Sequence, residues 1–210
     1  MRPPAALLAG ASLAAVCFAL AAPSRAQQPV PYTDVVIQAG HQGRPASCAP
    51  LHVKKCNLGA ASAAGRERDW TPIVADAAAR TLRRDGYRVL RRPADYRAHD
   101  RARFAAFVHF DGAIPNCASG ASAGFPLGTS PALAQRWRAA YAPRFPFAFR
   151  GLNITTNESG YYGFRKVDAP ENLLIEFGEL SCPAQAAWMK PRLGALGVLL
   201  ARFIETELRR

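Results

Sequence analysis

The 210-residue sequence lacks the features that are typical of coiled coils, repeat proteins and nucleic-acid-binding proteins. It has no heptads, internal repeat or low-complexity block, which argues against coiled-coil and repeat architectures. Acidic residues are few, 15 against 27 lysines and arginines, and the formal charge is +12. No helix-turn-helix, zinc-finger or aromatic RNA-binding motif accompanies this charge, so we expect no nucleic-acid partner. The excess of positive charge instead fits association with an anionic cell-wall or membrane surface.

Long apolar runs are also scarce, and the one that exists lies at the start of the chain. Arg2 precedes an apolar stretch from Ala5 to Ala22, and Ser24-Arg25-Ala26 follows it. A positive start, an apolar middle and small residues at the end form a secretory signal, which predicts cleavage near Ala26. Residues 1–26 are therefore expected to be a signal peptide and 27–210 a single secreted or periplasmic domain. Retention of the apolar run as a membrane anchor is the alternative, because its length approaches that of a spanning helix.

Cysteine is infrequent, and no pair has the two-residue spacing that is typical of a zinc ribbon or finger. Cleavage would leave Cys48, Cys56, Cys117 and Cys182. An even number of cysteines in an oxidising compartment predicts disulfides, and three pairings are possible. We favour 48 with 56, which closes a short loop, and 117 with 182, since each of these follows a predicted strand.

The hydrophobic pattern alternates between buried strands and amphipathic helices. Strands are expected at 34–38, 87–90, 104–110 and 172–177, with a long loop at 42–66. Helices are expected from Asp69, as a capping residue, to Gly86, then over 131–141, and from about Arg192 to the end. This order predicts an α/β fold: one domain with a twisted, mostly parallel sheet and helices on both faces.

Four polar residues lie at or near the ends of these strands and at the start of the first helix. They are His41, Glu67, His109 and Glu176. Side chains converge at strand ends in an open α/β sheet. Two imidazoles and one carboxylate can hold zinc with one position open for water, and another carboxylate can move the proton of that water. Taken singly, each histidine is more typical of a loop or a satisfied core position. A carboxylate inside the apolar run at Glu176 is costly without a partner or a nearby metal.

The surroundings of these residues resemble the zinc-dependent N-acetylmuramoyl-L-alanine amidases of the type 3 family. The matching segments, from about residue 34 to the end, are VVIQAGHQG at 35–43, GRERD at 65–69, FVHFDG at 107–112 and LIEFGEL at 174–180. Two departures are that Gln38 and Ala39 replace the usual Asp-Pro, and that Asp111 replaces an Asn that often follows the second histidine. The segment between Tyr87 and His109 is also shorter than usual.

The resemblance implies that His41, Glu67 and His109 bind zinc and that Glu176 is the general base and acid. It implies hydrolysis of the amide bond between N-acetylmuramic acid and L-alanine in peptidoglycan. The alternatives are a zinc peptidase acting on peptidoglycan stem peptides and a non-catalytic wall-binding module of the same fold.

Other polar residues near these motifs have weaker claims. Glu179 either shares the site or lies in a solvated turn. Arg165 is a candidate contact for a stem-peptide carboxylate, against the simpler interpretation as a surface arginine. His52 and His99 lie among polar loop residues and are expected at the surface.

Overall fold

The computed structural model describes residues 32–44, 57–94 and 99–210. The predicted signal peptide 1–26, Cys48, His52 and Cys56 lie outside the described residues, and expectations about them remain predictions. Among the described residues, no helix has the length and apolar character that crossing a bilayer requires. In chain order the elements are β1 Tyr32–Ala39, β2 Ala61–Ser62, β3 Gly65–Arg66, α1 Glu67–Arg84, β4 Val89–Pro93, β5 Asp100–Asp111, β6 Ala121–Gly124, α2 Ala132–Tyr141, η2 Ala142–Arg144, β7 Phe149–Leu152, α3 Thr156–Ser159, η3 Tyr162–Arg165, β8 Val167–Asp168, β9 Glu171–Glu179, α4 Pro183–Met189, η4 Lys190–Arg192 and α5 Leu193–Leu208.

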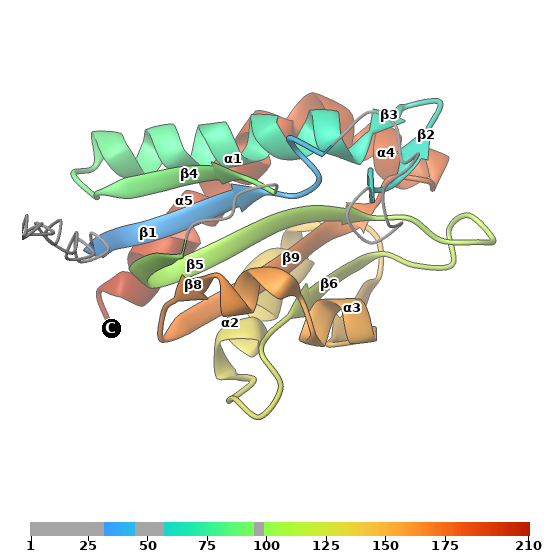
Figure 1. The fold of residues 1–210 in the computed structure, drawn as a ribbon. Coiled ribbons are helices and arrows are strands. Elements are labelled where there is room, and N and C mark those ends of the chain that lie inside the picture. Colours follow the sequence, from blue (N-terminus) through green and yellow to red (C-terminus); the bar gives the residue numbers. More distant parts are fainter. Residues whose placement is uncertain (1–31, 45–56, 95–98) are drawn as a thin grey trace, which may run out of the picture.

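A seven-stranded sheet forms the centre of the molecule (Figure 1). Its strand order is β4-β1-β5-β9-β6-β7, and β8 pairs with β5 beside this path. All pairings are parallel except that between β6 and β9. The predicted mostly parallel α/β sheet is therefore confirmed. The carboxyl ends of β1, β5 and β9 lie at one edge of this sheet, where ligand sites of such folds form.

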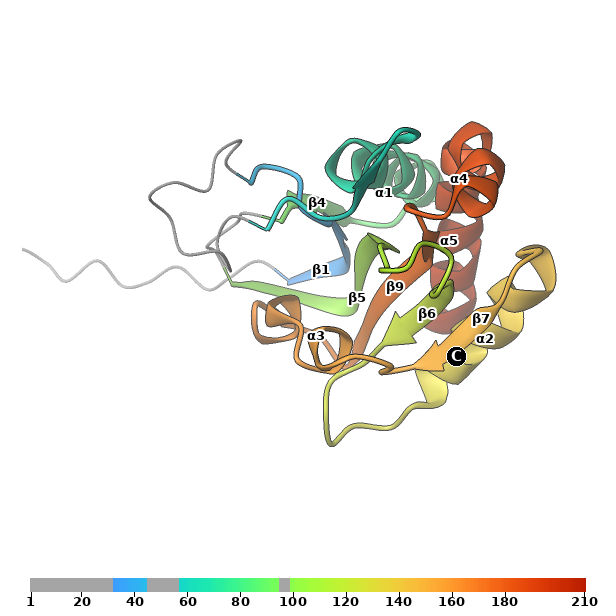
Figure 2. The ribbon, with the colours of Figure 1, turned by 90° about the vertical axis from the view of Figure 1, so that its right-hand side faces the viewer.

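The longer helices cover one face of the sheet, as Figure 2 shows for α1, α4, α5 and α2. The large core on this face joins alternate residues of the strands, such as Phe104 and Phe177, to Trp137 of α2 and Phe203 of α5. Helices α1 and α5 approach closely at Gly197, where an added Cβ would lie 2.3 Å from the carbonyl oxygen of Val74. Glycine is therefore required at this crossing.

Within the described residues, the opposite face carries only short helical segments, and its core is smaller. Phe107 of β5 and Leu174 of β9 are buried there against Tyr161 and Phe164, in and next to η3. Side chains alternate between the faces of a strand. Two residues further along these strands, His109 and Glu176 therefore project toward this same face.

The predicted elements are present, with differences at their ends. Helix α1 begins at Glu67, two residues before the expected cap, because the hairpin of β2 and β3 leads directly into it and the amide of Glu67 donates to the carbonyl of Ala60 (2.8 Å). Asp69 lies inside the first turn and pairs with Arg66 at 2.6 Å. The second strand starts at Val89 rather than Tyr87, because the amide of Tyr87 closes the end of α1 on the carbonyl of Leu82.

Candidate metal centre

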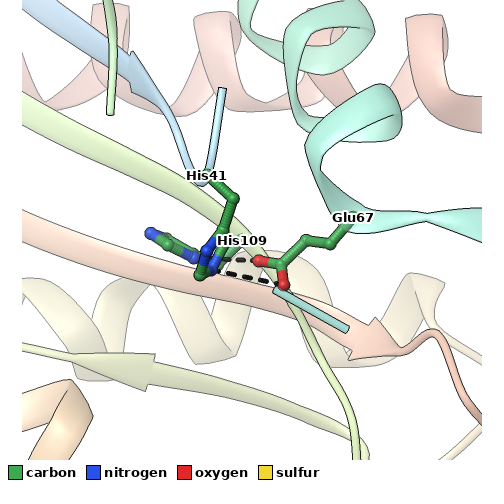
Figure 3. A group of neighbouring side chains, drawn as sticks. All are labelled: His41, Glu67 and His109. Carbon is green, nitrogen blue, oxygen red and sulfur yellow. Dashed lines mark hydrogen bonds and ion pairs between the residues drawn. The ribbon is translucent and has the colours of Figure 1, made fainter. Parts of the chain in front are cut away.

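Three of the four candidate residues meet at the carboxyl edge of the sheet (Figure 3). His41 follows β1, Glu67 is the first residue of α1, and His109 lies near the end of β5. Their possible ligand atoms all lie within 4.8 Å of one another. The cluster thus joins segments that are far apart in the sequence.

Both oxygens of the Glu67 carboxylate are directed toward the histidines. Oε1 lies 2.9 Å from Nδ1 of His109, and Oε2 lies 3.4 Å from Nε2 of His41. The amides of Phe110 and Ala60 donate to the two oxygens at 3.0 and 2.8 Å. Glu67 is buried, and burial alone would raise its pKa. The hydrogen bond with His109, and the positive charge that either histidine carries when it is protonated, outweigh this effect, and the pKa of Glu67 is lowered overall.

The orientation of His41 presents a nitrogen lone pair to the centre of the cluster. Its Nδ1 lies 2.8 Å from the carbonyl oxygen of Asn57. Because a carbonyl only accepts, Nδ1 carries the proton in the neutral ring and Nε2 faces Glu67 without one. The neutral form is favoured, since burial lowers the pKa of His41, with His109 and Arg44 acting in the same direction and Glu67 opposing them.

The backbone at the cluster is shaped to bring the ligands together. His41 has a φ of 57°, in the left-handed region that a non-glycine residue rarely adopts. Such strain is typical of functional positions. An added Cβ at Gly40 would lie 2.4 Å from Cε1 of His109, and one at Gly59 would lie 2.3 Å from Oε2 of Glu67. The two glycines therefore leave only enough space for the side chains of the cluster.

These observations fit a zinc ion. With bonds of about 2.0–2.2 Å, neighbouring ligands on a tetrahedral zinc lie roughly 3.3–3.5 Å apart, and Nε2 of His41 is 3.4 Å from Oε2 of Glu67. Two lone pairs facing each other at this distance repel unless a cation lies between them. Among the described residues, Nε2 of buried His109 also has no hydrogen-bond partner. The structure thus brings together the three residues that are expected to hold metal, and their imidazole nitrogens and carboxylate oxygens are suitable zinc ligands.

Glu176 occupies the position on β9 that is paired with His109 on β5. Its Oε2 is buried and has no hydrogen-bond partner within the described part of the chain. Burial raises the pKa of this carboxyl well above its usual range, and the negative charges of Glu67, Asp111 and Glu158 raise it further. A carboxyl with a raised pKa next to side chains that can hold a metal is suited to proton transfer near neutral pH.

Three other residues, Tyr161, Gln38 and Glu158, also shape this site. The ring of Tyr161 meets the ring of His109 edge to face at 5.0 Å between centroids, and its hydroxyl donates to Oε1 of buried Gln38. Gln38, at one of the positions that depart from the amidase pattern, therefore fixes the aromatic ring that packs on His109. Glu158, which is buried behind Ser122, accepts a hydrogen bond from its hydroxyl at 2.6 Å. The Thr155-x-x-Glu158 spacing of a capping box is the sequence signal that could have drawn attention to Glu158.

The expectation of a solvated turn at Glu179 is wrong, because the side chain is fully buried and holds a loop. Its carboxylate accepts from the amides of Cys117 and Ser119 at 2.6 and 2.7 Å and from the hydroxyl of Ser181. Cys117 also forms a disulfide with Cys182, as the favoured pairing predicted. Together these links anchor the loop after β5 to the segment after β9.

The remaining polar candidates lie at the surface. His99 is exposed, and its Nε2 lies 3.4 Å from the ammonium group of Lys166. Arg165 is exposed at the end of η3. Neither belongs to the metal cluster.

The chain matches no protein-family model and no curated protein by sequence, but it resembles several solved structures. Ami1 from Mycobacterium smegmatis, an N-acetylmuramyl-L-alanine amidase, has a TM-score of 0.65 at 19% identity over 84% of this chain and 96% of its own. AmiC2 of Nostoc punctiforme, an N-acetylmuramoyl-L-alanine amidase, has a TM-score of 0.61 at 19% identity over 85% of this chain and 98% of its own. Cwp6 from Clostridium difficile has a TM-score of 0.60 at 20% identity, covering 84% of this chain and 29% of its own, so the chain spans less than a third of that protein.

These matches show that the chain has an α/β fold with a largely parallel sheet. More narrowly, the chain has the fold of N-acetylmuramoyl-L-alanine amidases. The resemblance inferred from the sequence motifs is confirmed at the level of the fold.

Proposed function

We propose that the chain is a zinc-dependent hydrolase that cleaves the amide bond between N-acetylmuramic acid and L-alanine in peptidoglycan. The observation that carries this proposal is the convergence of His41, Glu67 and His109 within 4.8 Å on an amidase fold, next to Glu176. The solved structures named for this activity share the fold at less than 25% identity, so the assignment rests on the site as well.

In this proposal His41, Glu67 and His109 are the metal ligands. Zinc bound there would act as a Lewis acid that lowers the pKa of water and polarises the scissile carbonyl. The carbonyl of Asn57 holds His41 in the tautomer needed for binding. The ring of Tyr161 and the amide of Phe110 hold His109 and Glu67 in place.

Glu176 is the general base and acid of the proposed reaction. Its carboxylate accepts a proton from the attacking water and then returns that proton to the departing amine nitrogen of L-alanine. The second step needs a carboxyl with a raised pKa, which burial and the neighbouring carboxylates supply.

We also propose that the protein acts outside the cytoplasm, after signal cleavage near Ala26. The disulfide between Cys117 and Cys182 is consistent with an oxidising compartment. The formal charge of +12, which falls to +10 when Arg2 and Arg25 leave with the signal, would favour contact with an anionic wall or membrane surface.

Digestion of purified peptidoglycan, with the new ends identified by mass spectrometry, tests the function. We expect free L-alanine amino termini and muramic acid residues that have lost their peptide. New ends within the stem peptide would identify a peptidase instead. Binding to the wall without any new ends would identify a non-catalytic module. Glu176→Gln is the matched control, because it keeps the size of the side chain and removes proton transfer.

A further inference from the structure

We propose that Arg44 determines substrate specificity by binding a carboxylate on the peptide side of the scissile amide. This inference rests on the proposed amidase function. Arg44 follows directly after the segment 35–43 that resembles the amidase motif. The ligand group we assign is the free carboxylate of the second residue of the stem peptide.

Arg44 is held close to the metal cluster by the turn that follows β1. Its amide donates to the carbonyl of His41 at 3.3 Å, which closes the turn. The carbonyl of Gln42 accepts from the amide of Ala94 at 2.9 Å, which ties the same turn to the segment after β4. The backbone of Arg44 is therefore fixed relative to the candidate zinc ligand His41.

The guanidinium group is positioned by aromatic rings that lead back to the site. It lies over the ring of Tyr162, 5.3 Å from the centroid. Tyr162 donates its hydroxyl to the carbonyl of Ala94 and packs on Tyr161 with 4.7 Å between ring centroids. Tyr161 in turn packs on His109. A series of ring contacts thus connects Arg44 to His109, one of the proposed metal ligands.

The chemistry of the substrate decides which part of it Arg44 meets. The sugar side of the scissile bond offers hydroxyl, ether and amide groups, whereas free carboxylates occur only on the peptide side. A planar guanidinium stacked on an aromatic ring is suited to binding a carboxylate through two parallel hydrogen bonds. The second residue of an extended peptide lies roughly 7 Å from the cut bond, so its carboxylate is the free carboxylate nearest to that bond.

Two matched muropeptides test the inference. They carry the same full stem peptide and differ only at the second residue, which has either a free carboxylate or a carboxamide. Wild-type protein should prefer the carboxylate form. In Arg44→Gln the KM for this form should rise about 10-fold or more, with kcat little changed and the carboxamide form nearly unaffected, because an interaction made equally in the ground and transition states is lost. Arg44→Lys should recover only part of the preference.

Arg165→Gln is the control, because Arg165 is an exposed arginine in the adjacent η3 segment. It should keep the wild-type preference. Zinc content and the midpoint of thermal unfolding, measured for each variant, separate a binding defect from misfolding. The inference would be overturned if Arg44→Gln kept the wild-type preference or lost activity equally on both muropeptides. It would also be overturned if Arg165→Gln abolished the preference. Each of these results would leave the amidase function intact. Failure of wild-type protein to cut either muropeptide would instead refute the proposed function, and this inference with it.

Discussion

Replacing Gly40 by alanine should distort the candidate metal centre without removing a ligand. The new Cβ would lie 2.4 Å from Cε1 and 2.5 Å from Nδ1 of His109, and 2.6 Å from the carbonyl oxygen of Val108. Ordinary carbon contacts are about 3.5–4.0 Å, so the ring or the backbone must move by roughly 1 Å or more. The backbone is restrained, because Gly40 donates to Val108 at 2.8 Å and accepts from Thr71 at 2.6 Å.

The displacement should therefore fall largely on His109. Overpacking of this kind costs about 1–3 kcal/mol in the free energy of unfolding. Misplacing one ligand should weaken zinc binding about 10- to 100-fold, as the loss of a supporting contact typically does. Competition with a chromophoric chelator measures the affinity, and denaturant unfolding of the metal-free protein measures the stability.

Gly194→Ala is the matched control, since an added Cβ at this position in α5 meets no atom within 4 Å. It should leave zinc affinity unchanged and make α5 as stable or more stable, by up to about 1 kcal/mol. A Gly40→Ala variant with the zinc affinity and stability of the wild type would refute the account of how the histidine is held.

Three further predictions concern the catalytic group, the ligands and the disulfide. Glu176→Gln should lower the rate of wall cleavage about 10²-fold or more while zinc is retained, because positioned proton transfer accelerates a reaction about 10²- to 10⁴-fold. Initial rates of cleavage measure this effect, and a wild-type rate in the variant would show that Glu176 does not transfer the proton. His41→Ala and His109→Ala should each lose both zinc and activity, because each removes one of three protein ligands. If a variant kept its zinc, the histidine that it lacks would not be a zinc ligand. Replacing Cys117 and Cys182 together by serine should lower the free energy of unfolding by up to about 4 kcal/mol for a separation of 65 residues; an unchanged denaturation midpoint would count against a stabilising cross-link.

The sequence predicted the parts of the site that depend on local pattern and chain order. The run around Ile175 is too apolar for a surface strand, so the carboxylate of Glu176 within it was visible as an anomaly. His41 and His109 could be placed at strand ends because β-branched and aromatic runs precede them. The spacing of Leu133, Trp137 and Tyr141 predicted α2, and all three are buried in the core.

The remaining parts of the site depend on contacts that no local pattern encodes. Gln38 and Tyr161 are separated by 123 residues, yet their hydrogen bond sets the ring that packs on His109. Glu179 is one of three glutamates in β9, and only the folded loop shows that its partners are the amides of residues 117 and 119. Short strands such as β6 and β7 carry too few residues for a period of two to be recognised.

The most direct test of the account is the metal content of the protein purified without added metal. Elemental analysis of wild-type protein should find about one zinc per chain, since His41, Glu67 and His109 form a single cluster among the described residues. The same measurement on His109→Ala, compared with Arg165→Gln as a surface control, should find zinc lost only from the first. A wild-type chain that is folded, free of metal and still able to cut peptidoglycan would contradict the account.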